Sequence, residues 1–223
     1  INWIDITGEV KDFYQPDSLS LSTFYRNKST SNYSCGPVYS NSVFVEVYDP
    51  LVSGVIQGDT VICYNTTPDA ISFSNNSTGA NNDYSYQWYT SDDGSIWTSI
   101  TGATESFYEE GNLTDTAYYK ILTISNKGCG TTNSNSIKVS VYQDFKVGTI
   151  ELNDTVCYGE IPSLIINTTE PSGGDGNYFY NWYTSLNGST WSSIPGANED
   201  VFQPGSLVDT TYYKVVQTSG SGC

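Results

Sequence analysis

The sequence contains no histidine, no methionine and few basic residues, and these absences exclude several classes of function. Without histidine, neither a Ser–His nor a Cys–His catalytic pair can be assembled. Only 8 lysines and arginines stand against 24 aspartates and glutamates, so the net charge of −16 repels nucleic-acid phosphates and anionic lipids. No apolar run approaches the ~20 residues of a membrane-spanning helix. We therefore expect no nucleic-acid partner and no direct membrane insertion.

The sequence consists of an internal repeat that aligns without gaps. DTAYYK at 115–120 returns as DTTYYK at 209–214, which is 94 positions later, and tryptophans and cysteines recur at the same interval. Such a match indicates duplicated structural units, and ~94 residues is the size of a small domain. We expect the chain to be a segment of a longer protein. The repeat predicts three units: the C-terminal half of one unit at 1–50, a complete unit at 51–144, and a third unit lacking its last strand at 145–223.

Alternating side chains predict strands within each unit. In DYSYQWY (83–89), Tyr84, Tyr86 and Trp88 share one face, and NYFYNWY (177–183) keeps the same phase. NSIKVSVY (135–142) alternates in the same way, which predicts that Ile137, Val139 and Val141 face inward. NSVFVEVY (41–48) predicts the same for Val43, Val45 and Val47, and DDGS (92–95) has the composition of a hairpin turn. No stretch shows a helical period. Short strands at this spacing predict an all-β fold of tandem β-sandwich domains.

The segment LTDTAYYK (113–120) resembles the corner before strand F of immunoglobulin domains. The resemblance implies tandem immunoglobulin-like sandwiches in an extended array. It also implies that the hydroxyls of Tyr119 and Tyr213 bond back to the backbone, and that Trp88 and Trp182 are the core tryptophans of strand C. The family's strand-F cysteine is replaced by Ile121 and Val215, so aliphatic packing must fill its place.

Each full unit carries two cysteines in fixed places, which indicates structural disulfides outside the cytoplasm. Zinc is not expected, because two sulfurs per unit and no imidazole do not supply four ligands. One pairing lies within each unit, and the other crosses the junctions. We favour the first, which needs no fixed geometry between domains, although in a plain immunoglobulin topology the two positions lie at opposite ends. The within-unit bonds are Cys63–Cys129 and Cys157–Cys223, and the junction bonds are Cys35–Cys63 and Cys129–Cys157.

The carboxylate pairs that could support acid–base chemistry are not repeated. Asp92 with Asp93 becomes Leu186 with Asn187 in the next unit, and Glu109 with Glu110 becomes Gln203 with Pro204. We therefore expect no catalytic residues, no cofactor and no enzyme activity. Two other hypotheses concern binding. The first is that Asp49 and Asp144, which lie near the linkers, hold Ca²⁺ at the domain junctions, although no pattern of spaced oxygen ligands supports a metal site. Tyr89 and Tyr183 could stack on sugar rings.

Covalent modification is the stronger site hypothesis. Asp followed by Ser or Thr and then a small or aliphatic residue resembles the O-glycan acceptor motif of secreted Bacteroidota proteins. The resemblance implies glycosylation at five hydroxyls, those of Ser18, Thr60, Thr116, Thr155 and Thr210.

The complete unit pattern, from G-x-I through Y-x-Y-x-W-Y-T-S and L-x-D-T-x-Y-Y-K to G-C, extends over the whole chain. It is similar to the immunoglobulin-like or PKD-like repeats of giant Bacteroidota surface adhesins, which include the gliding adhesins of flavobacteria. The resemblance implies type 9 secretion, an outer-surface location, and a stalk role in adhesion or gliding. The partners it implies are neighbouring repeats, surface glycans and other cell-surface proteins. The alternative is a carbohydrate-binding accessory region of a secreted polysaccharide-degrading enzyme.

Overall fold

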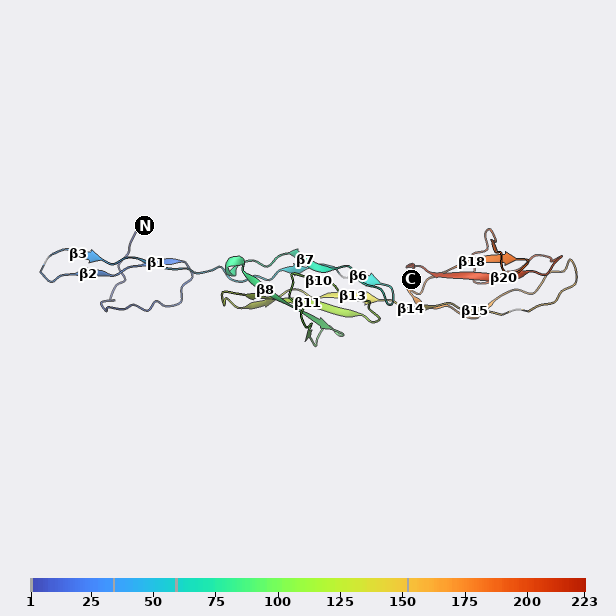
Figure 1. Cartoon of the computed structure of the whole chain (residues 1–223), viewed down its shortest axis with the longest axis horizontal. Helices are drawn as coiled ribbons and strands as arrows, with labels where there is room; N and C mark the ends of the chain where they lie inside the picture. Colours follow the sequence, from blue (N-terminus) through green and yellow to red (C-terminus); the bar gives the residue numbers. More distant parts are fainter. Residues whose placement is uncertain (1, 34, 59, 152) are drawn as a thin grey trace.

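The computed structural model describes residues 2–33, 35–58, 60–151 and 153–223. Three β-rich units lie in a row along the long axis of the molecule, and the chain passes from each unit to the next at one narrow junction (Figure 1). The C-terminus lies back at the junction with the middle unit rather than at the far end of the row. No helix among the described residues is long and apolar enough to cross a membrane.

The middle unit is a sandwich of two sheets. One sheet has the strand order β10-β7-β5, and the other has the order β6-β13-β11-β8-β9, with β12 also paired to β11. A single 3₁₀ turn, η1 (Ala80–Asn82), precedes β8. The strands are β5 (Val55–Ile56), β6 (Thr60–Ile62), β7 (Ile71–Asn75), β8 (Tyr84–Ser91), β9 (Thr98–Ser99), β10 (Phe107–Tyr108), β11 (Ala117–Ser125), β12 (Thr131–Asn133) and β13 (Ile137–Val141). This arrangement confirms the predicted all-β, immunoglobulin-like sandwich class.

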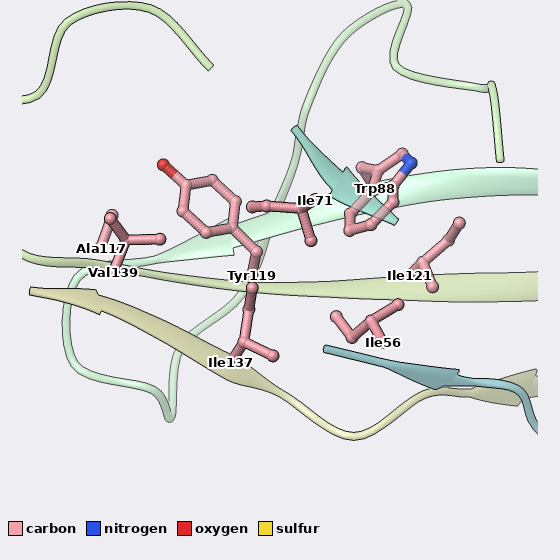
Figure 2. Packing of buried hydrophobic residues seen from close by; sticks show 8 residues of the cluster. All are labelled: Ile56, Ile71, Trp88, Ala117, Tyr119, Ile121, Ile137 and Val139. Atoms are coloured by element: carbon pink, nitrogen blue, oxygen red, sulfur yellow. The ribbon is translucent and has the colours of Figure 1, made fainter. Parts of the chain in front are cut away.

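The core of the middle unit lies between the two sheets (Figure 2). Strand β11 alternates strictly between buried and half-buried residues, as a strand with one face in the core must. Trp88 and Tyr119 are fully buried, and Ile121 pairs directly opposite Trp88. The predicted aliphatic replacement of the strand-F cysteine is confirmed at this position. Indole Nε1 of Trp88 donates a 2.9 Å hydrogen bond to the backbone carbonyl of Glu105, so its polar atom is satisfied.

The third unit repeats this core with its own residues. Trp182 is fully buried, pairs opposite Val215, and donates from Nε1 to the carbonyl of Glu199 at 2.9 Å. Both predicted core tryptophans are thus confirmed. Its strands are β14 (Gln143–Lys146), β15 (Thr149–Ile150), β16 (Asn167–Thr169), β17 (Ser172–Gly174), β18 (Tyr178–Ser185), β19 (Ser192–Ser193) and β20 (Tyr212–Ser219).

The first unit consists of two small antiparallel ladders, one of β1 (Thr23–Tyr25) with β4 (Val43–Val45), and one of β2 (Lys28–Thr30) with β3 (Pro37–Tyr39). None of the described residues of this unit is fully buried, and Val43, which was predicted to face inward, is 59% exposed. The physical reason is that, among the described residues of this unit, the strands form only two-stranded ladders, whereas the equivalent Ile137 lies between two larger sheets and is 4% exposed.

Candidate functional site: the junction between units

The chain entering the middle unit is fixed to that unit's proximal end, meaning the end that faces the preceding unit. The amide of Ala80 donates a 2.8 Å hydrogen bond to the carbonyl of Asp49, and Val52 and Thr78 exchange two backbone hydrogen bonds. Gly79 lies against Pro50 so closely that a Cβ on it would come within 1.9 Å of the Pro50 carbonyl oxygen. The linker is therefore part of the folded unit rather than a flexible tether.

The second junction is built in the same way. Strand β14, which contains Asp144 of the linker, pairs with β17 of the third unit. A Cβ on Gly173 would come within 2.0 Å of the Asp144 carbonyl oxygen. The hydroxyl of Tyr178 donates to the Gly173 carbonyl at 3.0 Å, and Tyr84 donates to the Gly79 carbonyl at 2.6 Å in the unit before. The glycine and tyrosine that hold each linker thus recur with the repeat.

Cys63 lies at the opposite, distal end of the middle unit because its first strand changes sheets. Strand β5 pairs with β7 in one sheet, and after a short connection β6 pairs in parallel with β13 in the other. The last pair of that ladder is Val141 with Ile62, next to the outgoing linker, and the amide of Tyr142 donates to the Ile62 carbonyl at 2.9 Å. Cys63 therefore stands at the start of the second junction.

Cys63 is bonded across this junction to Cys223, 160 residues further along the chain. Cys223 follows β20 of the third unit at that unit's proximal end, so the disulfide joins the facing ends of two units (Figure 1). The bond and the linker together connect the units twice.

Cys63 and Cys223 were both expected in disulfides and are bonded, but neither of the two predicted pairing schemes is formed. Strand β11 spans the length of the middle unit, with Ala117 opposite Val139 near the distal end and Ser125 near Cys129 at the proximal end. Nine residues of strand cover about 30 Å, whereas the Cα atoms of a disulfide lie within about 7 Å. A Cys63–Cys129 bond is therefore excluded. The junction bonds Cys35–Cys63 and Cys129–Cys157 are not formed either, and Cys35, Cys129 and Cys157 are exposed thiols.

The predicted tyrosine corner is also different from expectation. The hydroxyl of Tyr119 donates to Oε2 of Glu110 at 2.8 Å, a side-chain acceptor rather than the backbone. Tyr108 donates to the same oxygen at 3.1 Å, and the amide of Gly111 donates to the other carboxylate oxygen at 2.9 Å. Burial, with the Glu110 charge and this hydrogen bond adding to it, raises the pKa of Tyr108 to about 12. Burial raises the pKa of Tyr119 still further.

The equivalent position in the third unit has no carboxylate. Pro204 replaces Glu110, and Phe202 replaces Tyr108 between the rings of Trp182 and Tyr213. Burial raises the pKa of Tyr213. Glu110 thus supports the structure of one unit, whereas Glu109, its neighbour in the sequence, is exposed.

The other carboxylate pair lies in a turn. The Asp93 carboxylate accepts hydrogen bonds from the amides of Ser95 and Ile96, at 2.7 and 2.9 Å, and these bonds lower its pKa. Asn187 accepts the same two bonds in the third unit, from Ser189 and Thr190, so the role does not need a charge. Asp92 lies on an open depression beside Asp115 and Tyr142.

Asp49 and Asp144 of the linkers take part in the junction contacts described above through their backbone carbonyl groups. Among the residues that the structure describes, no group of three or more acidic or cysteine side chains could hold a metal ion.

The tyrosines considered for sugar stacking are half-buried and partly covered. The ammonium of Lys120 lies 5.6 Å from the centroid of the Tyr89 ring and 4.4 Å from that of Trp97. Lys214 has the same relation to Tyr183 and Trp191 in the third unit, at 5.4 and 4.5 Å. A cation therefore stacks on each of these rings, which makes the cluster a repeated feature of the sheet surface.

The five hydroxyls of the glycan motif lie in different surroundings. Ser18, Thr155 and Thr210 are exposed, and Thr60 is half-buried in β6. Asp59, which precedes Thr60, lies outside the described residues. Oγ1 of Thr116 accepts a 3.2 Å hydrogen bond from the amide of Val141 and is half-buried.

Sequence reasoning missed the residues that hold the linkers. Gly79 and Gly173 are separated by one repeat, and both have a φ in the left-handed region, of 85° and 77°. A glycine at the same position of both units was a usable indication that the backbone passes closely there.

One family model matches the chain three times, which agrees with the repeat. The family described as "Domain of unknown function (DUF8696)" matches residues 1–49, 52–143 and 146–223, so the chain belongs to this family. No curated protein matches the chain.

Two solved structures are similar. Domains A168–A170 from titin are 17% identical, with a TM-score of 0.48, over 90% of this chain and 70% of that one. The FN1–FN3 domains of chicken CNTN1 are 12% identical, with a TM-score of 0.31, over 89% of this chain and 73% of that one.

Proposed function

We propose that this member of the family is a non-catalytic stalk segment of an extracellular adhesive protein. The observation that carries the proposal is the second junction, where a disulfide and a linker paired into the next unit hold two sandwiches end to end. A row of domains connected in this way keeps its length, as a spacer must, whereas Gly/Ser tethers would let the domains collapse on one another. The net charge of −16 discourages association between neighbouring stalks.

The disulfide favours an oxidising compartment, since such bonds persist outside the reducing cytoplasm. Export by the type 9 secretion system, attachment at the outer surface of a bacterial cell, and a part in adhesion or gliding belong to the same proposal. They are supported by the resemblance of the unit pattern to Bacteroidota surface adhesins. Labelling of intact producing cells with a membrane-impermeant amine reagent tests the location, and a chain that reacts only after lysis contradicts it.

Small-angle X-ray scattering of the native chain tests the stalk. Three sandwiches of roughly 40 Å in a row give a rod of about 120 Å, whose radius of gyration is about 35 Å. A compact globule of this length has a radius of gyration of about 17 Å. We expect a value near that of the rod, and a value near that of the globule would overturn the proposal.

Covalent glycosylation remains a separate proposal for the exposed hydroxyls of Ser18, Thr155 and Thr210. Their exposure leaves room for a sugar, whereas the Thr116 hydroxyl oxygen is already hydrogen-bonded to the neighbouring strand. Intact-mass measurement of native material is the test. Additional hexose-scale masses that disappear in a variant with alanine at all three positions are expected, and a bare polypeptide mass rules the modification out.

A further inference from the structure

The free cysteines occupy the same places in their units as the bonded ones. Cys157 is one period after Cys63, and Cys129 is one period before Cys223. Cys157 and Cys63 each lie shortly after the start of their unit. Cys129 lies beyond the proximal end of β11, and Cys223 lies beyond the proximal end of the equivalent strand β20. Both free thiols are exposed.

The surroundings of Cys129 match those of the bonded site. Tyr142 contacts the strand that carries Cys63, since its amide donates to the Ile62 carbonyl at 2.9 Å. Tyr48 is the residue equivalent to Tyr142 in the first unit, and it lies close enough to Cys129 for the two side chains to interact electrostatically. At the second junction, Tyr142 lies next to the strand that carries Cys63. At the first junction, Cys129 lies next to Tyr48, the equivalent of Tyr142, and therefore near the place where an equivalent of Cys63 would lie.

We propose that Cys129 and Cys157 are disulfide-bonding sites for neighbouring copies of this unit, so that Cys63–Cys223 is one of a series of bonds, one at each junction. The cysteine after the first strands of each unit bonds to the cysteine at the proximal end of the next unit. The partner is thus a unit of the same family, and Cys35 takes the role of Cys129 at the junction before it. This inference rests on the proposed function only in requiring that units follow one another in an array.

Each bond forms by oxidation of two thiols. The two sulfurs lose two protons and two electrons, which an external disulfide, small or protein-borne, takes up as it is reduced to two thiols. The exposed position of each thiol allows the exchange to take place after the units have folded.

The bond changes the route that tension takes through the array. When the chain is pulled between its first residues and Cys223, tension that reaches the middle unit through β5 and β6 passes from Cys63 directly to Cys223, so residues 64–222 are outside the loaded path. Without the bond, the stretch between the two cysteines, whose sequence separation is 160, can be drawn out by about 550 Å. In a series of such bonds, tension within a unit still passes between its two bonded cysteines, for example Cys157 and Cys223 of the third unit, which are 66 positions apart. Each bond therefore reduces what an unfolding sandwich can release from the whole 94-residue repeat to this shorter stretch.

An extended version of the full chain tests the series of bonds. Residues 130–223 are appended directly after Cys223, which completes the third unit and adds a fourth that carries a copy of Cys223. Peptide mapping without reduction is expected to recover Cys157 linked to the appended copy of Cys223, together with the original Cys63–Cys223 bond. Recovery of Cys157 as a free thiol, or bonded to any other cysteine, overturns the proposal. In the control Cys157→Ser, the appended copy of Cys223 should become alkylated by a thiol reagent.

Single-molecule extension of the native chain between its termini tests the route of tension. The oxidised chain should show no extension from residues 64–222, and reduction or Cys63→Ser should release about 550 Å. Equal extension before and after reduction overturns the mechanical part. If scattering shows an elongated particle but Cys157 is free in the extended chain, only this inference is contradicted. If scattering shows a compact particle, the stalk is contradicted, and the peptide map of the extended chain still decides whether the series of bonds exists.

Discussion

The hydroxyl of Tyr119 donates a 2.8 Å hydrogen bond to Oε2 of Glu110, nine residues before it in the sequence. Tyr119 is fully buried in the core, and Glu110 belongs to the loop after β10. One carboxylate therefore connects a loop to the central strand of the unit and accepts hydrogen bonds from two tyrosines, the buried Tyr119 and the half-buried Tyr108.

Glu110→Ala should destabilise the middle unit by about 1–3 kcal/mol, because it leaves the Tyr119 hydroxyl buried without its acceptor. Hydrogen exchange of peptides from β8 and β11 measures this unit separately from the others. The matched control is Glu109→Ala, an exposed carboxylate next to it, which should stay within about 0.5 kcal/mol of the native chain. Equal effects of the two substitutions would show that the hydrogen bond contributes nothing.

The same cluster should make the chain sensitive to alkali. The pKa of Tyr108 is about 12 in the folded chain, above the usual value of about 10, so the folded state holds this proton more tightly than the unfolded state. The stabilisation is complete below pH ~10 and is lost as the pH rises toward 12. Tyr108→Phe, the residue of the sister unit, should reduce the fall in thermal midpoint between pH 9 and pH 11, followed by circular dichroism.

Tyr158→Phe is the control for that experiment, because Tyr158 is 83% exposed. Its thermal midpoint should fall with pH as steeply as that of the native chain. If Tyr108→Phe behaves like this control, burial of Tyr108 does not account for the alkaline sensitivity.

Asp93→Asn should keep the hairpin turn, because Asn187 makes the same two hydrogen bonds in the third unit. The hydrogen bonds lower the pKa of Asp93 in the folded state, so its charged form stabilises the fold. This stabilisation is complete at a pH above the unfolded-state pKa of about 4, and it is lost as the pH falls through the lower pKa of the folded state. The urea midpoint of Asp93→Asn should match that of the native chain at pH 7 and depend less on pH below 4. Asp93→Ala should lower the midpoint at pH 7, and an unchanged midpoint for the alanine variant would contradict the role of the turn.

Gly79→Ala should detach the first linker, because its Cβ would collide with the carbonyl oxygen of Pro50. We expect faster hydrogen exchange at the amides of Val52 and Ala80, which bond to Thr78 and Asp49. Gly102→Ala is the matched control: its φ is +80°, and a Cβ there meets nothing within 4 Å. The control carries the backbone cost of about 1–2 kcal/mol without the collision, so equal exchange in both variants would show that the linker does not depend on Gly79.

Strand positions and the core could be predicted from the sequence because local alternation decides which side chains face inward. Tyr84, Tyr86 and Trp88 share a face in β8, and Ile137 and Val139 are buried in β13 as their spacing required. The same argument failed for Val43, because burial needs a second sheet and alternation cannot tell whether one is present. The Tyr119 acceptor was missed for a similar reason: the resemblance to immunoglobulin domains carried a backbone partner, and this chain places a carboxylate within reach instead.

The sequence by itself determined that this protein is a series of like β-domains, since a period of matching residues and a two-residue alternation are both properties of the linear chain. Only the tertiary structure decided which cysteines meet. A strand that leaves one sheet and joins the other carries Cys63 to the far end of its unit, and the stacking of the next unit brings Cys223 to that place. Both are relations between segments remote in sequence, and a repeat fixes the interval between equivalent cysteines without fixing their distance in space.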